Sequence, residues 1–96
     1  MIIVNAKFFV KAEARTNFLE EIQGLIASSK QEVGCSSYEL YESVSHENEF
    51  VMIENWETVE ANQAHNTNPL LVAFAKNIAS YSVAKPILQV VEMKGE

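Results

Sequence analysis

The stretch EFVMIENWE, residues 49–57, decides the fold of this 96-residue chain. Successive side chains of a β-strand point to opposite faces, so each face can be read from alternate positions. Both faces of this strand are apolar, with Phe50, Met52 and Trp56 on one and Val51 and Ile53 on the other. Such a strand requires cover above and below.

Two other stretches predict strands that accompany it. Residues 37–45 precede residues 49–57 across the connection His46-Glu47-Asn48, and this spacing favours an antiparallel hairpin. Residues 2–11 alternate in the same way and are also apolar on both sides, with Val4 and Phe8 opposing Ile3 and Phe9.

Elsewhere the apolar period changes to three and four residues, which predicts amphipathic helices. The first helix is expected to begin near Glu13 and to end before Gly34, because glycine enters the left-handed conformation of a helix cap freely. Its apolar stripe is Phe18, Leu19, Ile22, Leu25, Ile26 and Val33.

A second helical region follows residues 49–57. Thr58 is expected to cap a short helix that runs to about His65, and Asn68-Pro69 to start another, because Asn caps helices and Pro fits the first helical position. The buried stripe of that helix is Leu70, Leu71, Phe74, Ala75 and Ile78. A last strand is expected over residues 87–93, with Pro86 just before it or at its start.

The predicted order is therefore β-α-β-β-α-β, which is one α+β domain of the ferredoxin-like kind over residues 1–96. A four-stranded antiparallel sheet carries both helices on one face of this fold. Two helices leave the other apolar face bare, and such a face usually marks an interface. We expect a homodimer in which two sheets pack face to face and enclose apolar space.

Composition excludes several other partners. Thirteen glutamates face six lysines and one arginine, and the formal charge of −6 repels nucleic acid and anionic membranes. A single cysteine and an N-terminus without a basic signal-peptide region predict a cytoplasmic protein. His46 and His65 lie far apart with no cysteine or clustered carboxylates between them, so no metal site is expected.

Several motifs resemble those of the antibiotic biosynthesis monooxygenase family, most closely its quinol monooxygenase members. They are Glu54-Asn55-Trp56-Glu57-Thr58, His65, the Asn68-Pro69 helix start and Gly34-Cys35-x-x-Tyr38. The resemblance implies a dimeric α+β barrel with one pocket per subunit. It also implies oxygenation of a quinol-like, apolar aromatic by molecular oxygen without a cofactor, because a deprotonated phenol can itself pass an electron to oxygen.

The same resemblance suggests site residues, each of which also has a purely structural explanation. Trp56 is expected to stack on a flat substrate or simply to fill the core. His65 is a candidate general base or a solvated group near a helix end. Glu54 is a rival base whose pKa would rise on burial, or the partner of a lysine. Asn5 is expected to bind a substrate oxygen or local backbone, and Met52 stands where some oxygenating relatives have an asparagine.

Two alternatives stay open. The same barrel could hold a hydrophobic ligand without catalysis. An isomerase of a small phosphorylated signal molecule is less favoured, because Lys76 and Lys85 are the only cations expected near the pocket. A haem-degrading activity is disfavoured, since that branch uses a histidine in the second long helix and residues 71–78 contain none.

Overall fold

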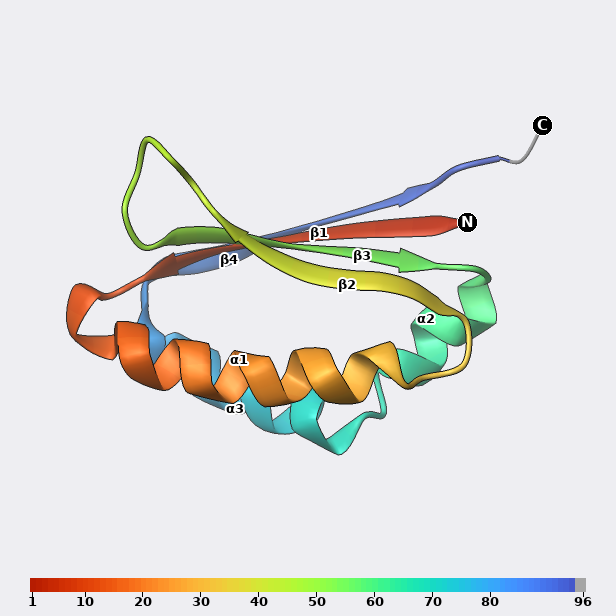
Figure 1. Cartoon of the computed structure of the whole chain (residues 1–96), viewed down its shortest axis with the longest axis horizontal. Coiled ribbons are helices and arrows are strands. Elements are labelled where there is room, and N and C mark those ends of the chain that lie inside the picture. Colours follow the sequence, from red (N-terminus) through yellow and green to blue (C-terminus); the bar gives the residue numbers. More distant parts are fainter. Residues whose placement is uncertain (95–96) are drawn as a thin grey trace.

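A computed structural model describes residues 1–94 as a four-stranded antiparallel sheet with its helices on one face (Figure 1). The predicted ferredoxin-like α+β fold is confirmed. Along the chain the elements are β1 (Ile2–Val10), a 3-10 turn (Ala12–Ala14), α1 (Arg15–Lys30), β2 (Cys35–Glu42), β3 (Glu49–Trp56), α2 (Val59–His65), α3 (Pro69–Tyr81) and β4 (Ser82–Glu92).

The stretch that decides the fold is the second strand from one edge of the sheet. The spatial order is β2-β3-β1-β4, and β3 pairs with β1 from Ile2 opposite Trp56 to Phe9 opposite Glu49. This register puts Val4, Glu54 and Tyr38 side by side on one face. The polar and apolar side chains that meet on that face build the site described below.

The core lies between this face and the helices. Phe18, Ile22 and Leu25 of α1 are fully or almost fully buried against Phe50 and Met52 of β3. The predicted caps of the later helices form: the Thr58 hydroxyl accepts from the Ala61 N–H at 3.0 Å, and Asn68 Oδ1 accepts from the Leu70 N–H at 2.9 Å. None of the helices in residues 1–94 is long and apolar enough to cross a bilayer.

The first helix ends earlier than predicted. It stops at Lys30, and Val33 lies in the following turn with 93% of its surface exposed, so Val33 does not belong to the buried stripe. Gly34 has the expected positive φ, at 84°. It lies in the turn just before β2, however, and not at the end of α1. A Cβ at this position would lie 2.5 Å from Ala61 Cβ, so the turn packs directly on α2.

The last strand begins earlier than predicted, at Ser82 instead of beyond Pro86. Its pairing with β1 shifts register between Lys7, which is opposite Ile87, and Phe9, which is opposite Ala84. Pro86 therefore lies in a bulge of an edge strand, where the missing N–H breaks no regular ladder. All residues of β4 after Ser82 are exposed.

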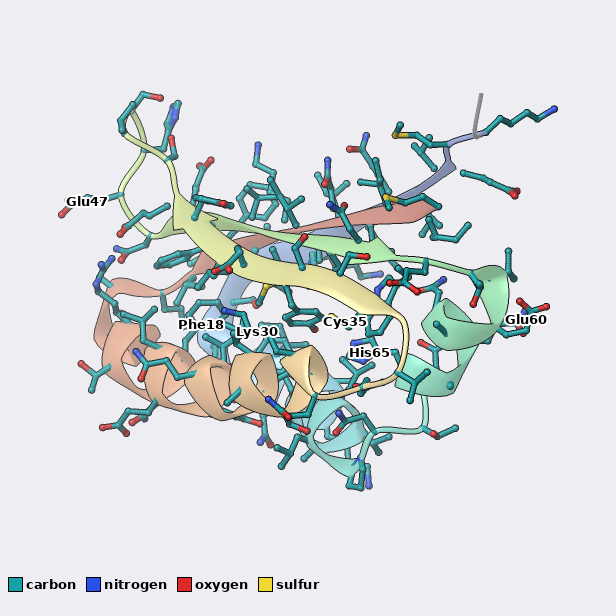
Figure 2. The ribbon with its side chains drawn as sticks, turned by 45° about the vertical axis from the view of Figure 1, so that its right-hand side comes forward. Phe18, Lys30, Cys35, Glu47, Glu60 and His65 are labelled. Carbon is teal, nitrogen blue, oxygen red and sulfur yellow. The ribbon has the colours of Figure 1, made fainter. Side chains whose placement is uncertain are left out.

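No helix of residues 1–94 covers the opposite face of the sheet (Figure 2). It carries the half-buried side chains of Ile3, Phe9, Val51 and Ile53 and the exposed side chains of Ile87 and Val91. We call this surface the bare face. Its apolar content matches what the sequence predicted.

Candidate active site

A cavity of about 340 Å³ lies between the sheet and the helices of a single chain. Its apolar walls come from α1, α3 and the three strands β1, β3 and β4, and include Val4, Ala6, Phe8, Ile22, Leu25, Met52, Leu71, Phe74, Ala75, Ile78, Leu88 and Val90. This volume and lining suit a small apolar molecule. The sequence led us to expect apolar space between two sheets, whereas this cavity lies on the helix-covered face.

The cavity exists because α3 does not pack fully against the sheet. Phe74 is the buried residue of α3, while Leu71 and Ile78 are only partly buried and Ala75 is exposed. The stripe that was predicted to be core therefore forms a cavity wall. On the other side, Leu88 and Val90 of β4 line the cavity while remaining more than half exposed, so the cavity opens at this edge of the sheet.

Polar side chains reach the cavity from β2, β3 and the α2 region. They are Tyr38, Glu54, Asn62, His65 and Asn66. The last three recur at three- and one-residue steps around the end of α2, and the register of β2 with β3 sets Tyr38 directly opposite Glu54. An apolar cavity with a few convergent polar groups is the usual form of a small-molecule site.

His65 is the centre of this polar cluster. It projects into the layer between the sheet and the helices (Figure 2) and is 3% exposed. Its Nδ1 lies 2.7 Å from Glu32 Oε2, its Nε2 lies 3.2 Å from the Tyr38 hydroxyl, and Glu54 Oε1 is 4.0 Å from Nε2. Both ring nitrogens therefore have partners, and Nε2 is the one directed at the residues that line the cavity.

Trp56 supports the cluster from behind. It is fully buried, and it is not one of the residues that line the cavity. Its indole N–H donates to Glu54 Oε1 at 3.0 Å, and its ring lies 4.7 Å from the His65 ring at an angle of 35° between the planes. Trp56 thus holds both Glu54 and His65 in place instead of forming a wall for a ligand.

Burial raises the pKa values of the Glu54 carboxyl group and the Tyr38 hydroxyl group. It raises the pKa of Glu54, an effect only partly offset by the Trp56 N–H and the nearby His65. Burial, followed by the charge of the Glu54 carboxylate, also raises the pKa of the Tyr38 hydroxyl. Tyr38 therefore stays neutral near pH 7, and its hydroxyl can donate a hydrogen bond to His65 Nε2.

The structure brings some of the predicted site residues together and not others. His65, Glu54 and Met52 line one cavity, with Trp56 behind them. Asn5 does not reach it, because odd-numbered positions of β1 face the bare side of the sheet, where Asn5 is opposite Ile53 and Gln89.

Sequence reasoning missed four polar residues of the site, namely Glu32, Tyr38 in its polar role, Asn62 and Asn66. Glu32 lies in a turn 33 positions before His65, and no periodicity signals a contact over that distance. Asn62 could have been found, since it precedes His65 by three residues on the same predicted helix.

Cations and metal-binding clusters are not part of this cavity. Lys76 and Lys85, the candidate phosphate contacts, are exposed, and within residues 1–94 no Lys or Arg lines the cavity. Within residues 1–94, no group of three or more His, Cys, Asp or Glu side chains is arranged to hold a metal ion.

The sequence is similar to that of a known protein family and to that of a named bacterial protein. The family model described as antibiotic biosynthesis monooxygenase matches residues 1–77. The "Putative monooxygenase YcnE" of Bacillus subtilis is 44% identical over 66 residues, which are 69% of this chain and 70% of that protein.

Solved structures share the fold at lower identity. The structure of Rv0793 from Mycobacterium tuberculosis superposes with a TM-score of 0.91 at 24% identity, over 99% of this chain and 96% of that one. A "putative antibiotic biosynthesis monooxygenase" from Deinococcus radiodurans gives a TM-score of 0.92 at 20% identity, over 100% and 95% of the two chains.

Proposed function

The chain belongs to the antibiotic biosynthesis monooxygenase family, and from this premise we propose that it oxygenates a quinol-like or other electron-rich aromatic without a cofactor. A monooxygenase-like role follows from the family and its relatives. The observation that carries the finer proposal is the apolar cavity in which His65 Nε2, a buried basic nitrogen, is directed at the polar end.

The reaction needs one proton acceptor and little else from the protein. A substrate hydroxyl takes the place of the Tyr38 hydroxyl as the donor to His65 Nε2 and gives up its proton there. The resulting phenolate passes one electron to O₂, and the two radicals combine to form a carbon–oxygen bond. Cleavage of the O–O bond then releases water, so that one quinol and one O₂ give one hydroxyquinone and one water.

The environment of the cavity favours these steps. Its walls are mainly apolar, so an aromatic ring displaces water without losing hydrogen bonds, and a dry site strengthens each electrostatic contact. Burial raises the pKa of Glu54, so this carboxyl group takes up a proton more readily than an exposed glutamate, and in its protonated form it can donate to the oxygen of the phenolate.

We further propose that the working form is a homodimer. The sheet has an apolar bare face, and Ile87, Leu88, Val90 and Val91 of its edge strand are each at least half exposed. Contiguous apolar surface of this kind on a soluble chain marks an interface. A second copy against the bare face and β4 would also narrow the open edge of the cavity.

Oxygen uptake with a panel of chemically reduced benzoquinones and naphthoquinones tests the proposal. We expect uptake above the uncatalysed background, with one O₂ consumed per quinol and a product that carries one additional oxygen atom by mass spectrometry. Accumulation of hydrogen peroxide with unmodified quinone would mean simple oxidation and would contradict a monooxygenase.

Two variants locate the activity. His65→Gln removes the basic nitrogen and should lower kcat by about 100-fold or more, which is the usual contribution of a positioned general base. His46→Gln, in the exposed loop after β2, is the matched control and should retain full activity. If the native protein binds a quinol of the panel but mass spectrometry shows that the quinol is recovered unchanged, the chain is a non-catalytic binder that uses the same cavity.

A further inference from the structure

We propose that Glu32 is a positioning residue that holds the proton of neutral His65 on Nδ1, and that the helix cap Asn68 holds Glu32 in turn. The catalytic consequence rests on the function proposed above. The tautomer itself does not, and it can be measured without a substrate.

The chain of contacts begins at the start of α3. The Leu70 N–H needs an acceptor, and Asn68 Oδ1 supplies it at 2.9 Å. This fixes the orientation of the amide, because the reversed amide would point its NH₂ group at the Leu70 N–H. The Asn68 Nδ2 group must therefore point the other way, where it donates to Ser28 Oγ at 3.1 Å and Glu32 Oε2 at 2.7 Å.

Glu32 receives a second donor on the same oxygen atom. His65 Nδ1 lies 2.7 Å from Glu32 Oε2, and the pair is largely shielded, with side-chain exposures of 4% for His65 and 20% for Glu32. A carboxylate can only accept, so the proton of this short contact belongs to Nδ1. The neutral ring then carries a free electron pair on Nε2.

The geometry on the other side of the ring agrees with this assignment. Tyr38 is a neutral hydroxyl at 3.2 Å from Nε2, and it can donate to an unprotonated nitrogen. The Trp56 ring, whose centre lies 4.7 Å from that of the imidazole, and the contact of Nδ1 with Glu32 leave the imidazole little freedom to turn over. Nε2 is therefore presented to the cavity as a proton acceptor before any ligand arrives.

Glu32 has a second effect once a proton has been accepted. When the substrate proton binds Nε2, the ring becomes an imidazolium, and the Glu32 carboxylate beside Nδ1 stabilises that positive charge. Glu32 does not line the cavity, so it acts only through His65. A change at Glu32 should therefore alter kcat and leave KM largely unaffected.

The tautomer is tested by ¹⁵N NMR of the two histidine rings, recorded on the alkaline plateau where their chemical shifts no longer change with pH. The ligand-free native protein should show His65 protonated on Nδ1 and unprotonated on Nε2. His46, in the exposed loop, serves as an internal reference for an unconstrained ring. Protonation of His65 on Nε2 in the native protein would overturn the proposal.

Three substitutions separate the parts of the argument. Glu32→Ala should make the His65 signals approach those of His46, and Glu32→Gln should retain the native pattern because its amide oxygen still accepts from Nδ1. Glu39→Gln is the matched control, since Glu39 is an exposed glutamate paired with Lys30 at 3.1 Å, and it should leave the spectrum unchanged. A native His65 spectrum in Glu32→Ala would refute the role of Glu32.

The kinetic arm uses the same proteins and the quinol panel. Glu32→Ala should lower kcat by more than about tenfold with KM within about twofold, and Glu32→Gln should lie between it and the native protein because it keeps the tautomer but loses the charge. A loss in KM alone would contradict a positioning role. If the native protein turns over no quinol, the proposed reaction fails, while the ring spectra still decide the tautomer.

Discussion

Replacing Trp56 with Phe should destabilise the protein by an amount that depends on pH. The substitution keeps an aromatic ring against His65 but removes the indole N–H that donates to Glu54 Oε1 at 3.0 Å. Above the folded-state pKa of Glu54 this leaves a buried carboxylate with one donor fewer. At low pH Glu54 is protonated, and the lost bond is an ordinary neutral one.

The magnitude follows from these two states of Glu54. A hydrogen bond to a charged group stabilises a protein by about 1.5–3 kcal/mol and a neutral one by about 0.5–1.5 kcal/mol. The smaller ring also leaves a void at a fully buried position, which costs about 1–2 kcal/mol at any pH. We expect a loss of about 3–4 kcal/mol near pH 8 and about 1–2 kcal/mol less near pH 4.

The sign of the wider pH dependence can be derived in the same way. Because burial raises the pKa of Glu54 in the folded state, the folded protein holds this proton more tightly than the unfolded chain. The contribution of Glu54 to stability is therefore fully present below the ordinary glutamate pKa of about 4.3, and it is lost as the pH rises through the folded-state value. Trp56→Phe should extend this loss, because the indole N–H favours the charged form.

Urea unfolding followed by far-UV circular dichroism measures the effect, since the substitution removes the only tryptophan. Native protein, Trp56→Phe, Glu54→Gln and the double variant should be compared at both pH values and at one protein concentration, because assembly would shift the transition. In the Glu54→Gln background, Trp56→Phe should lower the free energy of unfolding by the same amount at both pH values. That amount should equal the loss seen in the native background near pH 4. Equal costs at the two pH values in the native background would refute the reasoning.

Three further predictions concern the fold and its partner surface. Gly34→Ala should destabilise the protein by more than about 2 kcal/mol in urea unfolding, because the position has φ +84° and the new Cβ would lie 2.5 Å from Ala61 Cβ; an unchanged midpoint would contradict the turn geometry. Asn68→Ala should cost more than about 1 kcal/mol, because it removes the helix cap together with the Nδ2 contacts to Ser28 and Glu32, and Asn68→Ser should recover about 1 kcal/mol of this loss through the cap; equal losses in thermal unfolding would show that capping is not what Asn68 contributes. Val91→Lys places a charge on the bare face and should convert a dimer to monomers in sedimentation velocity, whereas Lys76→Glu on α3 should not; a dimer in both variants would exclude this face.

The fold was readable because short β-rich runs alternate along the chain with helical apolar periods. Residues 49–57 are a short run that is apolar on both faces, whereas the apolar positions of α1 repeat at three to four residues, and antiparallel pairing follows from the short connections. The errors fell at boundaries, where single residues decide. Val33 matched the helical period but followed the helix end, and Pro86 concealed a strand that continues through a bulge.

The site was only partly readable, because alternation gives the face of a residue but not its depth. Met52 and Trp56 share a face of β3, yet Met52 lines the cavity and Trp56 lies behind it, since α2 covers that end of the strand. Glu32 reaches His65 across 33 positions of sequence, and such a contact depends on how the turn after α1 packs on α2. Local patterns contain no information about that packing.

The bulge at Pro86 fixes which side chains of β4 face the cavity. Beyond it, Leu88 and Val90 face the cavity, while Gln89 and Val91 face the bare side of the sheet. Alternate positions of one strand would therefore contact a ligand on one side and a neighbouring chain on the other. Side chains can be exchanged in either set without disturbing the other. A single residue inserted or deleted between the bulge and Leu88 would swap the two sets, so this strand can vary in composition far more freely than in length.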